Sequence, residues 1–276
     1  MIDARTKLLA LIGHPVAHSL SPRFQNAALQ YLRLPFVYLA FDIPPERLRD
    51  ALEAFRVLGV LGFNVTVPHK EAICPFLDVL EEEAKVLQAV NTVVNREGKF
   101  FGYNTDVYGF QESLRREGVV VSGKTFLLLG AGGAAKSALF VLAKEKAQKV
   151  YLMNRTHERA VALCAWARNV LGFSCEVLPW LSQEVQAVHG IINATSLGLG
   201  GEVLPLPWEA FPSLEVVIDL VYHREGTPLV WEAKMRGIKS FDGKYMLLYQ
   251  GARSFSLFTG VSAPLEVMEE ALFGGF

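Results

Sequence analysis

The stretch TFLLLGAGGAA, residues 125–135, joins an apolar run directly to a glycine cluster. The run from Thr125 to Leu129 predicts a buried strand, and the alanine-rich residues after Gly133 predict a helix. The glycines fit the pattern G-x-G-x-x-G/A, with Ala135 in the last place. A strand, a glycine loop and a helix in this order are typical of a dinucleotide-binding unit, in which backbone N–H groups face a pyrophosphate. The simpler alternative is a glycine turn that only packs the helix on the sheet.

The next predicted strand, 149–153, ends at Asn154-Arg155-Thr156, where the adenosine ribose of a bound dinucleotide is expected. NAD sites usually have Asp or Glu here, whereas a guanidinium favours the 2′-phosphate of NADP. Arg159, one turn further on, adds a second positive charge. We therefore predict NADP as the cofactor. The alternative is that Asn154 and Thr156 cap the next helix while Arg155 is solvated.

Strand and helix signals alternate on both sides of the glycine loop. They predict an α/β fold of βαβ units with mostly parallel sheets. The predicted strands are 8–13, 36–43, 61–67, 125–129, 149–153, 174–177, 190–193 and 216–220, with a hairpin at 92–95 and 99–103. The predicted helices begin at Ser21, as a cap before Pro22, and at Pro45, and cover 106–117, 134–146, 156–170, 229–236, 246–258 and 265–273. Phe24, Ala27, Ala28 and Tyr31 are expected to form the apolar face of the first helix.

Composition excludes several classes of protein. The chain has 276 residues with 27 Lys and Arg against 28 Asp and Glu, a net charge of −1, which disfavours a nucleic-acid-binding role. No segment has the apolar length of a membrane span or the form of a signal peptide, so we expect a cytoplasmic protein. Cys74, Cys164 and Cys175 show no close pairing or metal-ligand spacing, and their odd number and low density suggest a reducing compartment rather than a disulfide framework. His14 and His18 have a proline between them, so we expect no metal site.

Four polar clusters follow predicted strands, where open α/β sheets place their ligands. They are His18-Ser19-Leu20-Ser21-Pro22, Asn64-Val65-Thr66-Val67-Pro68-His69-Lys70, Ala89-Val90-Asn91-Thr92 and Gly102-Tyr103-Asn104-Thr105-Asp106. Together with the glycine loop, and in this order, these motifs resemble the shikimate dehydrogenase family over about residues 8–260.

The resemblance implies a fold, a reaction and a domain organisation. The family reduces 3-dehydroshikimate to shikimate with NADPH, reversibly, in aromatic amino acid biosynthesis. An N-terminal α/β substrate domain with a mostly parallel sheet, 1–111 plus 246–276, is implied beside a Rossmann-like NADP-binding domain, 112–245, with the active site in a cleft between them. The partner is then a small molecule rather than nucleic acid or a membrane, and a homodimer is left open.

The resemblance also implies the roles of individual residues. Lys70 and Asp106 match the catalytic pair, and Ser19 and Ser21 match the binders of the substrate carboxylate. Further positions that contact the substrate are matched by Thr66, Asn91, Asp106, Tyr222 and Gln250. Cofactor positions are matched by Gly130, Ala131, Gly132, Gly133, Ala134, Asn154, Arg155, Thr156, Arg159, Leu220 and Gly243, and more loosely by Glu82.

The chemistry of these residues agrees with that reaction. Reduction of a ketone needs a hydride on carbon and a proton on oxygen, and Lys70 is suited to handle the proton. Taken alone, each residue has a simpler explanation: Lys70 as a solvated lysine, Asp106 and the serines as helix caps, and Thr66 as ordinary strand structure. For His69, either electrostatic tuning of Lys70 or a surface position is expected.

Two other functions compete with this interpretation. One is a quinate/shikimate dehydrogenase of the same superfamily with relaxed use of substrate or of NAD. The other is a non-catalytic NADPH-binding protein on the same fold, against which the presence of both Lys70 and Asp106 argues.

Overall fold

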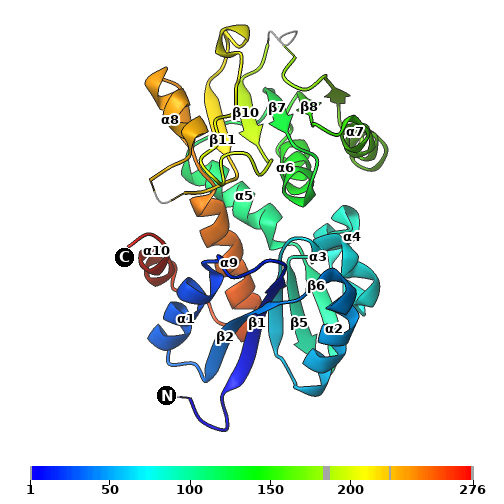
Figure 1. The fold of residues 1–276 in the computed structure, drawn as a ribbon, viewed down its shortest axis with the longest axis vertical. Helices are drawn as coiled ribbons and strands as arrows, with labels where there is room; N and C mark the ends of the chain where they lie inside the picture. Colours follow the sequence, from blue (N-terminus) through cyan, green and yellow to red (C-terminus); the bar gives the residue numbers. More distant parts are fainter. Residues whose placement is uncertain (1, 183–186, 224, 275–276) are drawn as a thin grey trace. The chain divides into compact units, whose positions relative to one another are not determined.

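The computed structural model describes residues 2–182, 187–223 and 225–274. The chain divides into two compact units, Met1–Gly109 with Leu248–Phe276, and Phe110–Leu247 (Figure 1). The first unit is made from both ends of the chain, and the second is continuous. Both boundaries fall inside helices, α5 (Thr105–Arg116) and α9 (Lys244–Thr259).

Within these described ranges, no helix has the length and apolar character that crossing a membrane requires.

The described part of the first unit contains a six-stranded mixed sheet. Its strands are β1 (Lys7–Gly13), β2 (Phe36–Asp42), β3 (Gly62–Val65), β4 (Val79–Leu80), β5 (Thr92–Arg96) and β6 (Lys99–Tyr103), in the order β2-β1-β3-β5-β6-β4. Parallel pairing joins β1 to β2 and β3, and β4 to β6, whereas β5 is antiparallel to both neighbours. The predicted α/β class with a mostly parallel sheet and one hairpin is confirmed. The short β4 was not predicted.

The hairpin of β5 and β6 places two polar segments next to each other. Its turn residues Glu97 and Gly98 have φ values of 55° and 84°, as a two-residue type I′ turn requires. The resulting register pairs Thr92 with Tyr103. Asn91, just before β5, therefore lies beside the residues 104–106 that follow β6.

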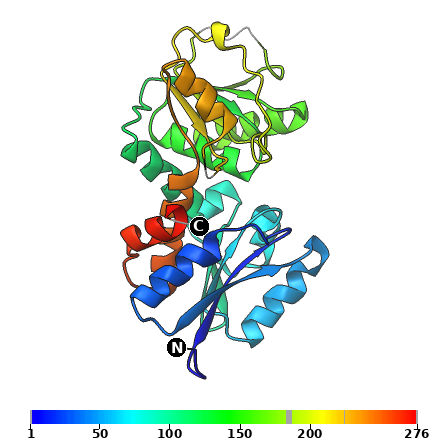
Figure 2. The ribbon, with the colours of Figure 1, turned by 60° about the vertical axis from the view of Figure 1, so that its left-hand side comes forward.

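Helices cover this sheet: α1 (Ser21–Tyr31), α2 (Leu48–Val57), α3 (His69–Ala72), α4 (Glu82–Leu87), α10 (Leu265–Phe273) and most of α9, with single 3₁₀ turns at Pro45–Arg47 and Cys74–Phe76. In Figure 2, α10 lies beside α1. A Cβ at Gly251 of α9 would be 2.5 Å from the Phe24 ring, so glycine lets α9 approach α1 closely. Phe55, Phe63 and Phe100 meet edge to face in the core, with ring centroids 5.1 and 5.4 Å apart.

Two predictions for α1 are wrong. Ser21 is the first helical residue rather than the cap, and the cap position belongs to Leu20, which makes no side-chain capping bond. The helix begins one residue earlier than the proline signal indicated. Tyr31 is 65% exposed at the last turn, whereas Phe24 and Ala28 are buried as expected.

The second unit has a six-stranded parallel sheet among its described residues. The strands are β7 (Thr125–Leu129), β8 (Lys149–Met153), β9 (Cys175–Val177), β10 (Gly190–Asn193), β11 (Val216–Asp219) and β12 (Lys239–Phe241), in the order β12-β11-β10-β7-β8-β9. The helices besides α5 and α9 are α6 (Gly133–Lys144), α7 (His157–Leu171) and α8 (Pro228–Met235), with a 3₁₀ turn at Trp208–Ala210. From β7 the chain builds β8 and β9 on one side and β10 to β12 on the other. Ligands of open α/β sheets bind at the carboxyl ends of strands where the order reverses in this way.

The cysteines depart from the sequence prediction. Cys164 of α7 and Cys175 of β9 form a disulfide, with their Cα atoms 5.2 Å apart. The interpretation that the cysteines lack a close pair is therefore wrong, and the disulfide disagrees with the reducing compartment inferred from their number and density. The chain reverses at Gly172, whose φ is 61°, so that two residues 11 apart in sequence meet between helix and strand.

Candidate active site

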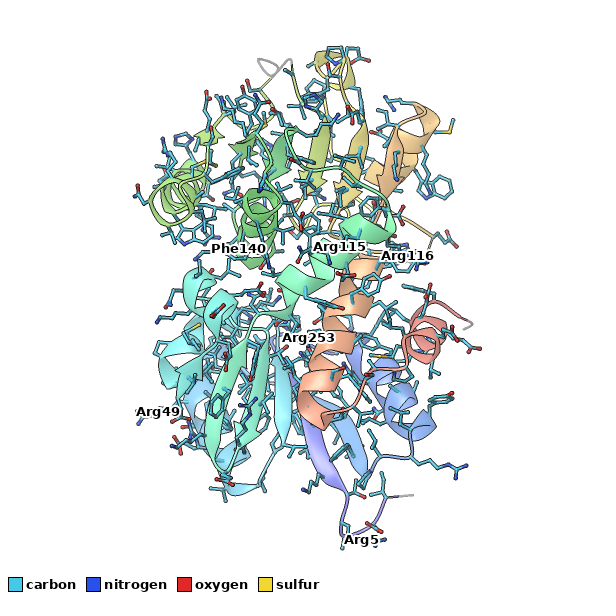
Figure 3. The ribbon with its side chains drawn as sticks, turned by 180° about the vertical axis from the view of Figure 1, so that it is seen from behind. Arg5, Arg49, Arg115, Arg116, Phe140 and Arg253 are labelled. Atoms are coloured by element: carbon cyan, nitrogen blue, oxygen red, sulfur yellow. A yellow bond between two sulfur atoms is a disulfide. The ribbon has the colours of Figure 1, made fainter. Side chains whose placement is uncertain are left out.

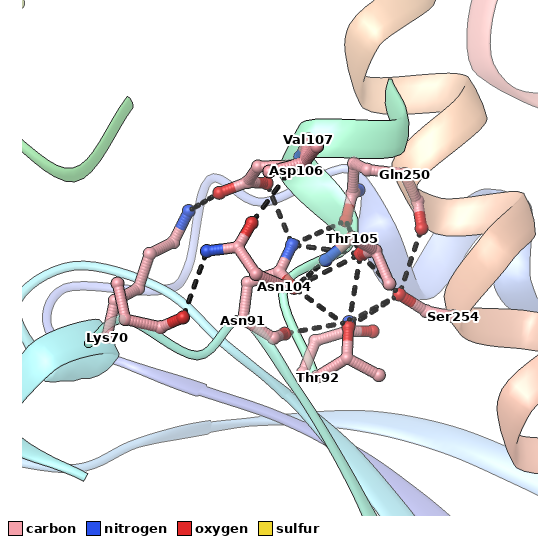
Figure 4. Close-up of polar contacts among 11 residues, drawn as sticks. Lys70, Asn91, Thr92, Asn104, Thr105, Asp106, Val107, Gln250 and Ser254 are labelled. Atoms are coloured by element: carbon pink, nitrogen blue, oxygen red, sulfur yellow. Dashed lines mark hydrogen bonds and ion pairs between the residues drawn. The ribbon is translucent and has the colours of Figure 1, made fainter. Parts of the chain in front are cut away.

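Lys70 and Asp106, the predicted catalytic pair, are in direct contact (Figure 4). Lys70 Nζ donates to Asp106 Oδ2 over 2.7 Å, and the two side chains are 21% and 8% exposed. Lys70 belongs to the short helix after β3, and Asp106 lies in the first turn of α5, after β6. A charge-assisted hydrogen bond with so little solvent around it fixes the position of the ammonium group.

His69 anchors the helix that carries Lys70. Its side chain is buried, and Nε2 lies 2.7 Å from the carbonyl oxygen of Ile43, so this ring nitrogen carries a proton and donates it. The amide of Val90 donates to the Lys70 carbonyl over 2.8 Å. The surface position considered for His69 is therefore wrong, because the ring is turned inward to the end of β2.

Asn91 organises the other side of the pair. Its Nδ2 donates to Asp106 Oδ1 over 2.8 Å and to Thr105 Oγ1 over 2.9 Å, and its Oδ1 accepts from the Thr105 amide over 2.7 Å. Both carboxylate oxygens of Asp106 thus have a donor. The alternative that Asp106 caps α5 is wrong. The amide of Val107, at the start of α5, donates to Asn104 Oδ1 instead.

Helix α9 contributes the third side of the network. Gln250 Oε1 lies 3.4 Å from Asn91 Nδ2, and Ser254, one turn later, contacts Thr92 and Thr105 at 2.8 and 3.1 Å (Figure 4). The same helix carries Arg253, whose guanidinium lies 5.9 Å from the centre of the Tyr108 ring (Figure 3).

Beneath this network, a fully buried tyrosine is linked to it through an asparagine. Asn64 Nδ2 donates to the oxygens of Asn91, Thr92 and Ser254 at 3.0 Å, and its Oδ1 accepts from the Tyr38 hydroxyl at 2.8 Å. Burial raises the pKa of Tyr38, so its hydroxyl stays protonated and can donate. Rotation of Asn91 would break several of these bonds, so the network is pre-organised.

The predicted carboxylate binders form a separate group. Ser19 Oγ accepts from the Ser21 amide over 3.3 Å, and Ser21 is 7% exposed. Thr66 is half-buried directly after β3, with its methyl group against Gly13. In the described part of the chain, no hydrogen bond joins these three side chains to the Lys70 network.

The glycine loop of the second unit has the expected geometry. Gly130 has a φ of 105°, and a Cβ there would lie 2.8 Å from the carbonyl oxygen of Ala194. Gly132 precedes the first turn of α6, and a Cβ on it would meet no atom within 4 Å. The open space over Gly132, with Ala131, Gly133 and Ala134 partly exposed around it, fits a pyrophosphate at the helix N-terminus.

The segment after β8 presents two unpaired arginines. Arg155 and Arg159 are exposed and have no hydrogen bond or ion pair among the described residues. Asn154 Nδ2 donates to the carbonyl of Thr156, which closes the turn into α7, and Thr156 makes no side-chain cap. Two guanidinium groups without acidic partners fit a phosphate monoester.

The remaining predicted residues lie in both units. Leu220 and Gly243 follow β11 and β12 in the second unit, where a Cβ on Gly243 would collide with the Leu220 backbone. Tyr222 is in the second unit and half-buried, and burial raises its pKa. Glu82 is exposed at the start of α4 in the first unit, whereas the other predicted cofactor residues are in the second.

Sequence reasoning assigned no role to four side chains of the network, Asn64, Thr92, Thr105 and Ser254, although the first three stand in its polar clusters. A usable signal existed for two of them. Asn64 stands two residues before Thr66 in the predicted strand 61–67, which predicts a shared face, and Ser254 stands four residues after Gln250 on one helix face.

Comparisons with known proteins cover almost the entire chain. Three family sequence models match it: the shikimate dehydrogenase substrate binding domain at residues 11–93, shikimate / quinate 5-dehydrogenase at 113–198, and the shikimate 5′-dehydrogenase C-terminal domain at 245–273.

Individual relatives agree with these matches. A curated relative from Aquifex aeolicus, shikimate dehydrogenase (NADP(+)), is 44% identical over 99% of this chain and 98% of its own length. The crystal structure of shikimate dehydrogenase from Aquifex aeolicus superposes with a TM-score of 0.90 at 43% identity, covering 98% of this chain and 99% of that one. Shikimate 5-dehydrogenase from Thermus thermophilus, in complex with NADP(H) and shikimate, gives a TM-score of 0.86 at 40% identity, covering 96% and 98%.

Proposed function

Since the chain belongs to the shikimate dehydrogenase family, we propose that it catalyses the reversible NADPH-dependent reduction of 3-dehydroshikimate to shikimate. It is then an oxidoreductase of the CH–OH group in aromatic amino acid biosynthesis. The observation that carries this proposal for the chain's own residues is the largely buried contact between Lys70 and Asp106.

The proton of the reaction passes through Lys70. When bound in the second unit, NADPH would supply the hydride of the reaction. In reduction the Lys70 ammonium donates a proton to the carbonyl oxygen, and in oxidation the neutral amine accepts the proton of the shikimate hydroxyl. Asp106 keeps the amine directed at that oxygen, and Asn91 keeps Asp106 from rotating.

The substrate is held by groups of the first unit. Ser19 and Ser21 donate hydroxyl hydrogen bonds to its carboxylate without adding a fixed charge. Thr66, Asn91 and Gln250 bind its hydroxyl groups. For Tyr222, which belongs to the second unit, substrate contact stays a prediction from the resemblance. A site built from such donors and acceptors discriminates against analogues that lack a hydroxyl, because its own polar groups are then left unpaired.

The second unit binds the cofactor. The residues from Gly130 to Ala134 face the pyrophosphate, and Arg155 and Arg159, with Asn154 and Thr156, bind the 2′-phosphate. Leu220 and Gly243 complete the cofactor set of this unit. Glu82, in the first unit, stays a looser prediction from the resemblance. The substrate domain is then 1–111 plus 246–276, and the NADP domain 112–245.

Two further expectations from the sequence stand as proposals. Cell fractionation tests the cytoplasmic location, and sedimentation equilibrium tests the homodimer.

A steady-state assay tests the function directly. Purified protein is given shikimate or quinate with NADP⁺ or NAD⁺, and formation of the reduced cofactor is followed by absorbance. We expect the highest kcat/KM with shikimate and NADP⁺. Faster turnover of quinate, or a preference for NAD⁺, would favour the quinate/shikimate dehydrogenase, and binding of NADPH without any turnover would favour a non-catalytic protein.

A further inference from the structure

The second unit buries a carboxylate that the proposed chemistry does not use. Asp219 is the last residue of β11, and Asn193, its partner in the sheet register, is the last residue of β10. Both side chains are fully buried. Burying a carboxylate costs free energy unless hydrogen bonds or an opposite charge compensate it, so the contacts of Asp219 indicate what it does.

One oxygen of Asp219 holds two different segments. Oδ1 accepts from Asn193 Nδ2 over 2.8 Å and from the amide of Val221 over 3.1 Å. The hydroxyl of Thr227, also buried, interacts with the carboxylate from the start of α8. Oδ2 is buried without a well-formed hydrogen bond among the described residues.

Asn193, which is bonded to Asp219, also holds the loop after β10 through its own hydrogen bonds. Its Oδ1 accepts from the amide and hydroxyl of Thr195 at 3.1 and 2.7 Å, and its Nδ2 donates to the carbonyl of Leu197 at 3.0 Å. This loop lies against the glycine loop, since a Cβ on Gly130 would be 2.8 Å from Ala194 O and 3.1 Å from the Thr195 amide. The shape of the glycine loop therefore depends on the position of residues 194–197.

The bond to Val221 fixes the segment after β11 in the same way. The Val221 carbonyl accepts from the Gly243 amide over 3.1 Å, and Gly243 packs on the backbone of Leu220. Leu220 and Gly243 are both in the proposed cofactor set. One carboxylate thus connects the glycine loop with these two positions through contacts that lie wholly inside the second unit.

We propose that Asp219 is a positioning residue for the cofactor, which holds the loops after β10 and β11 in their binding arrangement through Asn193 and the Val221 amide. The inference rests on the proposed function, because it presupposes that the second unit binds NADP. It assigns Asp219 no contact with the substrate or the reacting atoms. Its loss should therefore weaken cofactor binding and leave shikimate binding largely unaffected.

The test compares Asp219→Ala, Asp219→Asn and a control, Glu215→Gln. Glu215 is exposed immediately before β11 and pairs at the surface with Lys124, so the control makes the same carboxylate-to-amide change at the other end of the same strand and loses only a surface ion pair. The Kd of NADP⁺ is measured by calorimetry without shikimate, and KM is measured for both substrates. Circular dichroism confirms folding.

We expect Asp219→Ala to raise the Kd and KM of NADP⁺ about ten-fold, because two buried donors lose their acceptor. The KM of shikimate should change less than about two-fold. Asp219→Asn keeps an acceptor oxygen and should remain within about three-fold of the parent, and Glu215→Gln should equal the parent. A merely structural role would lower the unfolding temperature of Asp219→Ala but leave the ratio of the two KM values unchanged.

Several results would overturn the inference. If Asp219→Ala binds NADP⁺ as tightly as the parent, the inference is overturned and the proposed function is not. A parallel rise of the KM values of NADP⁺ and shikimate has the same consequence. If Asp219→Ala does not fold, Asn193→Ala removes the bond to Asp219 and the bonds to the loop after β10 but keeps the bond from the Val221 amide to Asp219. An unchanged NADP⁺ affinity of that variant overturns the inference too. A parent protein that binds no NADP⁺ overturns the proposed function, and this inference with it.

Discussion

Replacing Asp219 by asparagine should stabilise the second unit at neutral pH. Burial, aided by the nearby Asp242 carboxylate, raises the pKa of Asp219 from 3.8 to about 6. The hydrogen bonds from Thr227, Val221 and Asn193 lower this pKa but do not offset the effect of burial. A pKa difference of one corresponds to about 1.4 kcal/mol, so keeping this carboxylate ionised in the folded chain costs about 3 kcal/mol. Asparagine has nearly the same shape and carries no charge, so most of that cost should disappear.

The dependence on pH follows from the direction of the shift. Because the folded pKa lies above the unfolded one, the cost is absent below about pH 3.8 and complete above about pH 6. The parent loses this part of its stability as the pH rises through that range. The advantage of Asp219→Asn should therefore grow from about 1.6 kcal/mol at pH 5 to about 3 kcal/mol at pH 8.

The assay is urea unfolding at pH 5, 6.5 and 8, followed by circular dichroism, with parent, Asp219→Asn and Glu215→Gln side by side. The control should stay within about 1 kcal/mol of the parent at each pH, because its carboxylate is exposed and makes only a surface ion pair with Lys124. An advantage of the same size at all three pH values, or a loss of stability at pH 8, would refute the reasoning, since neither agrees with a buried carboxylate whose pKa is raised.

Three further predictions concern the reaction, the cofactor and the fold. Lys70→Met should lower kcat by about 10²- to 10⁴-fold in stopped-flow assays and leave the Kd of NADP⁺ unchanged. The control Lys85→Met changes an exposed lysine of the same unit and should behave as the parent. Turnover of Lys70→Met within a few-fold of the parent would contradict the proton role. Arg155→Ala should weaken NADP⁺ binding about ten-fold without affecting NAD⁺, measured by calorimetry, and an unchanged preference would remove the 2′-phosphate assignment. Cys164→Ser should lower the free energy of unfolding by about 3 kcal/mol, because the unfolded chain is no longer cross-linked between two residues 11 apart in sequence. Equal urea midpoints for variant and parent would contradict this expectation.

The sequence was most informative where local chemistry decides the structure. The four apolar residues after Thr125, followed by a glycine loop, located β7 and α6, because a buried parallel strand and a tight turn leave few other choices. The hairpin at Glu97-Gly98 was predictable for the same reason, since its turn requires residues that tolerate positive φ.

Features that depend on distant segments were harder to predict. The strands β4 and β12, of two and three residues, are too short to show a period, and they exist because a neighbouring strand offers hydrogen bonds. The Cys164–Cys175 pair depends on a chain reversal between helix and strand, and the burial of His69 depends on a carbonyl 26 residues away. The motifs indicated the residues of the site, but the arrangement of Asn64 and Ser254 around Asn91 comes from packing.

Because the first unit is made from both ends of the chain, it cannot be completed on the ribosome until the last helices have been synthesised. Thr105 contacts Ser254, a residue that is synthesised 149 positions later, which takes roughly 7 to 30 s at ordinary translation rates. Throughout that interval the polar groups around Asn91 have no α9 beside them. By its end, before Ser254 is added, the continuous second unit has all of its described strands. The nascent chain should therefore acquire its nucleotide-binding half first, and the proton-transfer site should form only after α9 has left the exit tunnel.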